Sequence, residues 1–165
     1  MPGSRDDGSI EELRAEVTRT ATRLDALARG LQEARKTSVA QLGRTNDAAL
    51  IVAGYLETYY TALETLFVRA SAHFENNLNP QQWHADLLEK MNLSIPELRE
   101  RLVSDENLPR LRELMRFRHF RRYFVEMEYD WLRIDFLLNC LEAAHPVVLR
   151  DLDRFDEFLL ALASA

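Results

Sequence analysis

The residues best suited to chemistry lie between Arg110 and Arg122. This stretch, RLRELMRFRHFRR, holds six arginines, one histidine and a single acid, Glu113. Its local charge of +5 contrasts with the net charge of −6 of the whole 165-residue chain. Because guanidinium groups bind phosphate in a bidentate geometry, the stretch indicates a local surface for phosphate or nucleic acid. The alternative is a solvated helix face held by ion pairs, for which Glu113 is the one local partner.

Helical geometry gathers part of this stretch on one face. At about 100° per residue, four polar side chains fall within an arc of roughly 60°: Arg112, Arg116, His119 and Tyr123. Apolar residues border this strip on both sides: Leu108, Leu111 and Met115 on one side, Phe117, Phe120 and Phe124 on the other. We expect such a strip to form the floor of a cleft or a seam between the two subunits of a homodimer.

Arginine, histidine and tyrosine on one face can support metal-free cleavage of RNA. An arginine stabilises the charge on the scissile phosphate, and a histidine or a tyrosine moves the proton of the attacking 2′-hydroxyl. Histidine suits this proton transfer better, because its ordinary pKa of about 6.5 is near neutrality, whereas that of tyrosine is about 10. His119 is therefore the proton-transfer residue that the sequence favours on this strip.

The elements that must position the strip are all helical. All five glycines lie at or before Gly54, and no Asn-Gly or Asp-Gly turn joins segments of alternating polarity. A short helix is expected near residues 80–91, and a short segment follows near residues 95–103. The last helix is expected to bend or break at His145-Pro146. The prediction is an all-α antiparallel bundle of four main helices, with one or two short extra helices. The main helices are expected at residues 10–35, 46–75, 104–124 and 130–162.

Two acids on the second helix are expected to orient the basic helix. Residues 46–75 are apolar nearly all round, which indicates the most buried helix of the bundle. Glu57 and Glu64 lie on this helix. Because buried charges need partners, we expect both to face arginines of the helix at residues 104–124.

A capping pattern predicts where the folded domain begins. Ser9 is a good N-cap, and Glu12 three residues on completes a capping box, so the first helix is expected to start at Ile10. We therefore expect residues 1–9 to be disordered. Residues 10–165 are long enough for a single helical domain and too short for two.

Composition restricts location and cofactors. The lone Cys140 cannot form an intramolecular disulfide, which fits a reducing cytoplasm. The N-terminal MPGSRDDGSI lacks the apolar region of a signal peptide, and no stretch approaches the roughly 20 apolar residues of a membrane span. The four histidines lack metal-ligand spacing, and no nucleotide-binding fingerprint is present. We expect no metal, no cofactor and no membrane contact.

Several stretches resemble the HepT-like ribonuclease toxins of the HEPN superfamily, which are helical bundles. The segment RFRHFRRYFVEMEYDW resembles their active-site helix and the link that follows it. The other similar stretches are GYLETYYTALETLFVRAS, WHADLLEKM and LEAAHPVVLRDLDRFDEFL. The resemblance covers roughly residues 48–163 and leaves the first predicted helix unmatched. It implies a HEPN-like fold and a metal-independent endoribonuclease activity.

The family's catalytic signature is altered at two of its three positions on this chain. When R-x(4–6)-H-x-Y is laid on the sequence, Arg116 or Arg118 matches the arginine. Tyr123 then occupies the histidine position, and Val125 occupies the tyrosine position.

A second placement of the signature matches its arginine and its histidine but not its tyrosine. Arg112 and His119 have the required spacing, but Arg121 then stands where the tyrosine should be. The resemblance leaves two interpretations open: either His119 and Tyr123 act as shifted replacements, or the nuclease is degenerate.

The resemblance also implies partners. It implies a homodimer in which two active-site helices face each other across a cleft, which agrees with the seam inferred from the polar strip. It further implies a cognate minimal nucleotidyltransferase antitoxin that silences the toxin by attaching AMP to the signature tyrosine. With Val125 at that position, the acceptor would be another residue, for which Tyr123 and Tyr129 are the candidates.

These observations lead to an expected function and site. The leading expectation is a metal-independent endoribonuclease toxin of a toxin–antitoxin system. The alternative is a catalytically degenerate HEPN protein that binds RNA or the nucleotidyltransferase. The expected catalytic residues are Arg116 and Arg118 for phosphate charge, His119 for proton transfer and Tyr123 as its hydrogen-bonding partner. The arginines expected to bind RNA are Arg112, Arg121 and Arg122.

Overall fold

The computed structural model describes residues 6–75, 83–123 and 128–164, without the side chains of residues 6–7, 83–85 and 123. No described residue belongs to a β-strand, so the predicted all-α class is confirmed. One isolated antiparallel bridge joins Ile95 and Arg99. The described helices are α1 (Asp6–Lys36), α2 (Ser38–Leu42), α3 (Asn46–Glu75), α4 (Trp83–Asn92), α5 (Leu108–Tyr123) and α6 (Trp131–Ala163).

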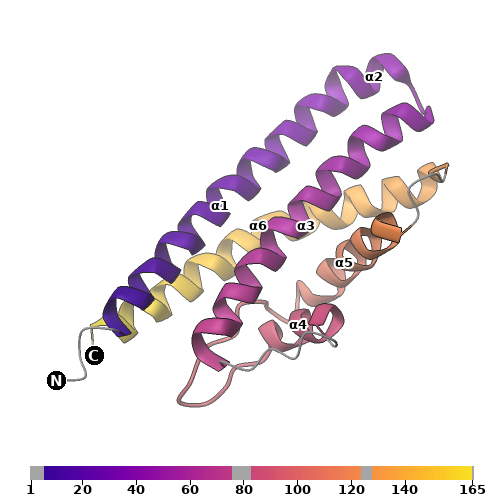
Figure 1. The fold of residues 1–165 in the computed structure, drawn as a ribbon. Coiled ribbons are helices and arrows are strands. Elements are labelled where there is room, and N and C mark those ends of the chain that lie inside the picture. The colour runs from indigo at the N-terminus through magenta and orange to yellow at the C-terminus, as the bar shows by residue number, and fades with distance from the viewer. Residues whose placement is uncertain (1–5, 76–82, 124–127, 165) are drawn as a thin grey trace.

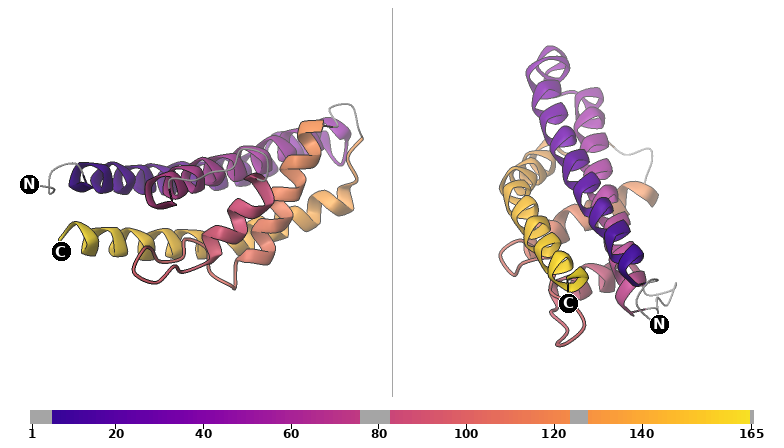
Figure 2. Two further views of the ribbon diagram at one scale, coloured as in Figure 1. Left: turned by 60° about the horizontal axis from the view of Figure 1, so that its bottom comes forward. Right: turned by 90° about the vertical axis from the view of Figure 1, so that its left-hand side faces the viewer.

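The four longer helices, α1, α3, α5 and α6, alternate in direction, so that each runs antiparallel to the one before it. In Figure 1, α1 and α3 form a long hairpin, and α1 begins at the end of the bundle where α6 finishes. Figure 2 shows α1 and α3 as one layer, and α4, α5 and α6 pack on one side of that layer. With 16 residues, α5 is about half as long as α1, α3 and α6, and it covers one end of the bundle (Figure 1).

The apolar faces predicted from the sequence form the core. On α1, Leu13, Val17, Leu24 and Leu31 are buried, with Leu27 partly buried beside them. On α3, the buried side chains cover somewhat more than one face of the helix, and the opposite face carries the exposed Leu50, Thr65, Arg69 and Ala72, so the helix is central but is not buried all round.

Gly30 lets α1 and α3 approach closely. A Cβ atom at this position would lie 3.0 Å from Cε1 of Tyr55.

A polar chain joins α1 to the rest of the bundle through the core. The hydroxyl of buried Tyr59 on α3 lies 2.9 Å from Nδ1 of His145 on α6. Nε2 of the same histidine lies 3.3 Å from Oδ1 of Asp25 on α1. Burial raises the pKa of Tyr59, which keeps its hydroxyl protonated at neutral pH. These contacts tie three helices together at one level of the bundle.

Several of the helix boundaries predicted from the sequence were wrong. The helix α1 begins at Asp6, so residues 6–9 are helical and Ser9 is not its cap. Ser9 instead places its hydroxyl 2.9 Å from Nδ1 of His73 on α3. The connection predicted at residues 36–45 contains the short helix α2. Of the bend or break predicted at His145-Pro146, the break is absent, because Pro146 lies inside the continuous helix α6.

The loop between α4 and α5 is fixed by buried polar groups and is not helical at residues 95–103. The fully buried side chain of Arg99 donates to Glu75 through Nη2 at 2.6 Å. It also donates to the carbonyl groups of Lys90 and Leu93, both at 2.9 Å. These bonds satisfy a buried cation and hold the loop against the ends of α3 and α4.

None of the described helices combines the length and the apolar character that crossing a bilayer requires.

Candidate active site

The helix α5 is held on three sides and open on the fourth. It packs against α3, α4 and α6. Just before it, the backbone N–H and the hydroxyl of Ser104 both donate to Oδ2 of buried Asp151 at 2.9 Å. Pro109 stands at the second residue of the helix, where the missing N–H costs no intrahelical hydrogen bond.

One side of α5 is pinned to α3 by ion pairs. Arg118, whose side chain is 15% exposed, donates to Oε1 of buried Glu64 at 2.6 Å and to the hydroxyl of Thr61 at 2.9 Å. Arg121 pairs with Glu57 at 3.2 Å. The expectation that these two acids face arginines of the basic helix is confirmed. The geometry turns Arg118 and Arg121 toward the core of the bundle.

The outward strip carries Arg116 and His119. The side chain of Arg116 is 60% exposed, and its Nη1 lies 3.0 Å from Oε1 of Glu113. His119 lies three residues further along the helix and is partly exposed. Tyr123 closes α5, and its side chain lies outside the described residues. The predicted site residues are therefore divided: Arg116 and His119 share the open side, and Arg118 faces α3.

Glu113 links the strip to α6. Its second oxygen, Oε2, accepts from Nη2 of Arg133 on α6 at 2.8 Å. The hydrogen bond from Arg133 is the main reason that the pKa of Glu113 lies below its ordinary value. The carboxylate thus stays charged near neutrality and holds two guanidinium groups in place.

The other arginines of α5 lie at its edges. Arg112 donates to Glu89 of α4 at 2.6 Å through Nη2 and at 3.1 Å through Nε. Arg110 lies 3.7 Å from Glu106 in the turn before the helix. Arg122 is exposed and has no ion pair with any residue in the described ranges. The sequence around the α5 arginines offers few acids, and α3 and α4 therefore supply most of their ion-pair partners.

The apolar border of the strip differs from the prediction. Phe117 is buried and belongs to the core, because its side of α5 packs against α6. Phe120 is 38% exposed, so it does border the open side. The predicted border residue Phe124 lies outside the described residues.

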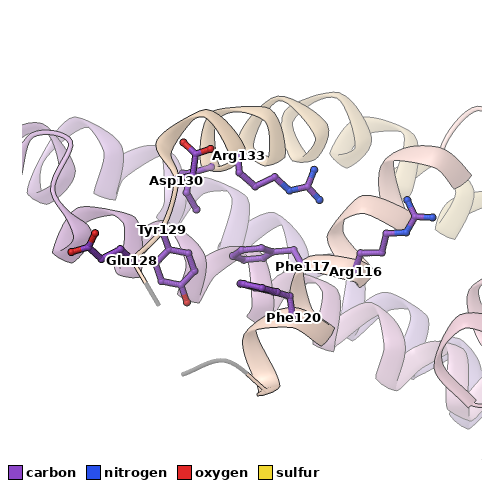
Figure 3. Close-up of a pocket in the computed structure, with 8 residues that line it drawn as sticks. Arg116, Phe117, Phe120, Glu128, Tyr129, Asp130 and Arg133 are labelled. Atoms are coloured by element: carbon purple, nitrogen blue, oxygen red, sulfur yellow. The ribbon is translucent and has the colours of Figure 1, made fainter. Parts of the chain in front are cut away.

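A pocket opens between the end of α5 and the start of α6 (Figure 3). The rings of Phe117 and Tyr129 lie 6.2 Å apart, and Phe120 lies beside them. We call this the α5–α6 pocket; its volume is about 430 Å³ and it is lined by Arg116, Phe117, Phe120, Glu128, Tyr129, Asp130, Arg133 and Ile134.

The pocket wall at residues 129–131 is anchored to the start of α3 and to the residue before it. The backbone N–H of Tyr129 donates to Oδ1 of Asn46 at 3.0 Å, and Nε1 of Trp131 donates to the carbonyl of Thr45 at 3.1 Å. Asp130 caps α6 by accepting from the N–H of Leu132 at 2.9 Å. These bonds fix the backbone that carries the Tyr129 side chain.

Reasoning from the sequence missed Arg133 and the pocket. Arg133 is a single cation at the start of a long helix, and nothing in the local pattern separates it from a solvated surface residue. Its role depends on a contact with Glu113, twenty residues away along the chain. Among the described residues, no three His, Cys, Asp or Glu side chains are grouped so that they could hold a metal ion.

Comparison with protein families gives a match over most of the chain. The sequence model of the family described as HepT-like protein matches residues 51–159, which include the whole of α5 and most of α3 and α6. The helix α1 lies outside the match. No curated protein and no solved structure matches the chain significantly.

Proposed function

The chain belongs to the HepT-like family, and from this premise we propose that it is a metal-independent endoribonuclease toxin of a toxin–antitoxin system. It would act on RNA in the cytoplasm, at a cleft built from α5 of two copies. This proposal places the chemistry on the outward strip of α5 and leaves the inward arginines the task of fixing that helix.

The observation that carries the proposal is the exposure of Arg116 beside His119. Arg116 is 60% exposed, and its three-residue separation from His119 makes the two side chains neighbours on the helix surface. The helix behind them is fixed by the pairs that Arg118 and Arg121 form with α3. A cation and an imidazole on a rigid open face are the groups that cleavage of a phosphodiester needs.

The chemical step uses the RNA's own nucleophile. His119 removes the proton of a 2′-hydroxyl, and that oxygen attacks the adjacent phosphorus. The bond from phosphorus to the 5′-oxygen breaks, which gives a 2′,3′-cyclic phosphate and a 5′-hydroxyl after a proton reaches the leaving oxygen. Arg116 stabilises the negative charge on the phosphoryl oxygens. In this assignment Tyr123 is a hydrogen-bonding partner of the reacting groups.

A homodimer would complete the cleft. Phe120 on α5 and two residues near the start of α6, Leu132 and Phe136, are exposed apolar side chains, with Leu132 77% exposed. Apolar side chains beside a charged strip are typical of a surface that a partner covers. Light scattering should therefore give twice the chain mass of 19.2 kDa at micromolar concentration. A mass of one chain would contradict the composite cleft.

A degenerate relative is the second candidate, and two observations favour it. Val125 stands at the signature tyrosine, and Arg118, one of the two residues that match the signature arginine, is paired with Glu64 on α3. Such a protein would bind RNA or a nucleotidyltransferase antitoxin without cutting. If that antitoxin transfers AMP to this chain, the candidate acceptors are Tyr123 and Tyr129, of which Tyr129 is partly exposed.

Growth arrest on expression tests the proposal. Wild-type protein induced in a bacterial host should arrest growth, and Arg116→Ala should not. Arg150→Ala, which removes a comparably exposed arginine on α6, is the matched control and should remain toxic. Arrest by Arg116→Ala at wild-type protein levels would contradict the assignment, and harmless wild-type protein would favour the degenerate alternative.

A further inference from the structure

We propose that the α5–α6 pocket binds one base of single-stranded RNA, with the phosphate of that nucleotide held by the two arginines at its rim. The inference rests on the proposed function, because it gives the cleft a subsite for its substrate. It concerns recognition of the RNA chain and adds no step to the cleavage reaction.

The walls of the pocket suit a flat aromatic ligand. Phe117, Phe120 and Tyr129 present three rings around a space of about 430 Å³. That volume falls within the roughly 300–1,000 Å³ of small-molecule sites. Every nucleobase has a π-face that stacks on aromatic side chains, so such a wall accepts any base. The size and the rings together favour one nucleoside over a larger group.

Charge on the rim gives the bound nucleotide a direction. Figure 3 shows the guanidinium groups of Arg116 and Arg133 at one end of the pocket and the carboxylate of Glu128 at the other, with the aromatic rings between them. A phosphate is attracted to the two cations and repelled by Glu128 and by Asp130, the second acid that lines the pocket. The base then lies among the rings, and the sugar–phosphate lies toward the open strip of α5.

The pocket and the proposed reaction site share Arg116. This residue lines the pocket and also stands beside His119 on the strip. A nucleotide seated in the pocket therefore brings its own phosphodiester to the strip, which is the positioning that accelerates a bond cleavage. The pocket therefore fixes the orientation of the bound RNA, which a flat surface of arginines would not do.

The pocket is built before any ligand binds. Glu113 bridges Arg116 and Arg133, with distances of 3.0 Å and 2.8 Å, so both cations are held at the rim. Tyr129 is fixed through its backbone bond to Asn46. Side chains that are already ordered lose less conformational entropy on binding, so an arrangement of this kind favours a higher affinity.

Calorimetric titration with an uncleavable RNA tests the inference. The probe is 2′-O-methyl hexauridylate, which cannot be cut because it lacks a free 2′-hydroxyl, and whose bases stack little on one another. Phe120→Leu should weaken binding on the order of 5- to 150-fold, the effect of losing one stacked base. Phe120→Trp should retain binding. Phe158→Leu, the same change on the partly buried far part of α6, is the matched control and should bind like wild type.

Salt dependence separates stacking from phosphate binding. Arg133→Gln should reduce the slope of log affinity against log salt by about 0.7, the contribution of one phosphate on a single strand. Phe120→Leu should leave that slope unchanged. Free uridine monophosphate should bind far more weakly than the hexanucleotide; equal affinity would show that the pocket takes free nucleotides and would overturn the RNA assignment.

The outcomes separate this inference from the proposed function. Saturable binding that Phe120→Leu weakens, in a protein that cuts no RNA, would uphold the pocket and contradict the nuclease. Cleavage of RNA by a Phe120→Leu protein that binds the probe like wild type would uphold the nuclease and overturn the pocket. Absence of saturable binding to wild-type protein would also overturn the pocket. Circular dichroism of each variant checks that the helices are intact.

Discussion

Arg116 and Arg118 are two residues apart on α5, and their guanidinium groups have opposite surroundings. Arg118 is 15% exposed and forms a 2.6 Å ion pair with Glu64 of α3, whereas Arg116 is 60% exposed and pairs with Glu113 of its own helix. An ion pair removed from water fixes the helix that carries it, and an exposed cation stays accessible to phosphate. One basic helix thus has a structural side and a side available for chemistry.

The largest expected effect belongs to the outward side. His119→Ala should reduce RNA cleavage by about 10²- to 10⁴-fold, the range typical of a general acid or base. Tyr123→Phe should lose much less activity, because the hydroxyl that it removes only forms a hydrogen bond to the reacting groups. Single-turnover cleavage of a defined RNA by the two purified variants gives the comparison. Equal losses, or a larger loss with Tyr123→Phe, would move the proton transfer away from His119.

On the inward side the expected effect is on stability. Glu64→Ala should lower the free energy of unfolding by about 3–5 kcal/mol, because it leaves the largely buried guanidinium of Arg118 without its carboxylate. Urea denaturation measures the change. The double variant Glu64→Leu with Arg118→Met should recover most of the loss, since it removes both charges together. A loss below about 1 kcal/mol for Glu64→Ala, the range of exposed pairs, would remove the distinction between the two sides of the helix.

The bridge made by Glu113 should appear as a pH dependence of stability. Its pKa in the folded protein lies below the ordinary value of 4.5, mainly because of the hydrogen bond from Arg133. The carboxylate's contribution is therefore complete above about pH 4.5 and is lost as pH falls through the lower folded value. Glu113→Gln should cost about 1 kcal/mol at pH 7 and less at pH 3. Urea midpoints at both pH values measure this. An equal cost at both would contradict the bridge, and Glu106→Gln is an exposed control.

The smallest effect tests the contact between α3 and α5. A Cβ at Gly54 would lie 3.8 Å from Nη1 of Arg121, which is an ordinary contact, so Gly54→Ala should stabilise the protein by about 0.5–1 kcal/mol. Gly30→Ala should destabilise it, because its Cβ would lie 3.0 Å from the ring of Tyr55. Thermal unfolding compares the two substitutions. Destabilisation by Gly54→Ala would mean that Arg121 packs more tightly on α3 than the structure indicates.

Local patterns predicted much of the fold. The continuous apolar character of residues 46–75 predicted the bounds of α3, and the spacing of Leu13, Val17, Leu24 and Leu31 predicted the buried face of α1. The start of α1 could not be predicted in the same way. Ser9 has the sequence pattern of a cap, but its hydroxyl bonds to His73 on another helix, and that contact is not visible in the local sequence.

The candidate site was predicted in part. Helical geometry places residues two apart on nearly opposite faces, so it separates Arg118 from Arg116. Arg118 was predicted as a catalytic residue only because its spacing fits the arginine of the family signature. The partners Glu57 and Glu64 were predicted because buried charges need counter-charges. Arg133 could not be predicted, because its contact with Glu113 exists only once α5 and α6 pack together.

The most direct test of the two-sided helix compares Arg116→Ala with wild type in two assays on the same purified protein. Arg116→Ala should keep the free energy of unfolding within about 1 kcal/mol of wild type, because its ion pair with Glu113 is largely exposed. It should also lose cleavage of a defined RNA by at least about 10²-fold, the effect of removing one stabiliser of transition-state charge. Wild-type cleavage by stably folded Arg116→Ala would contradict the account.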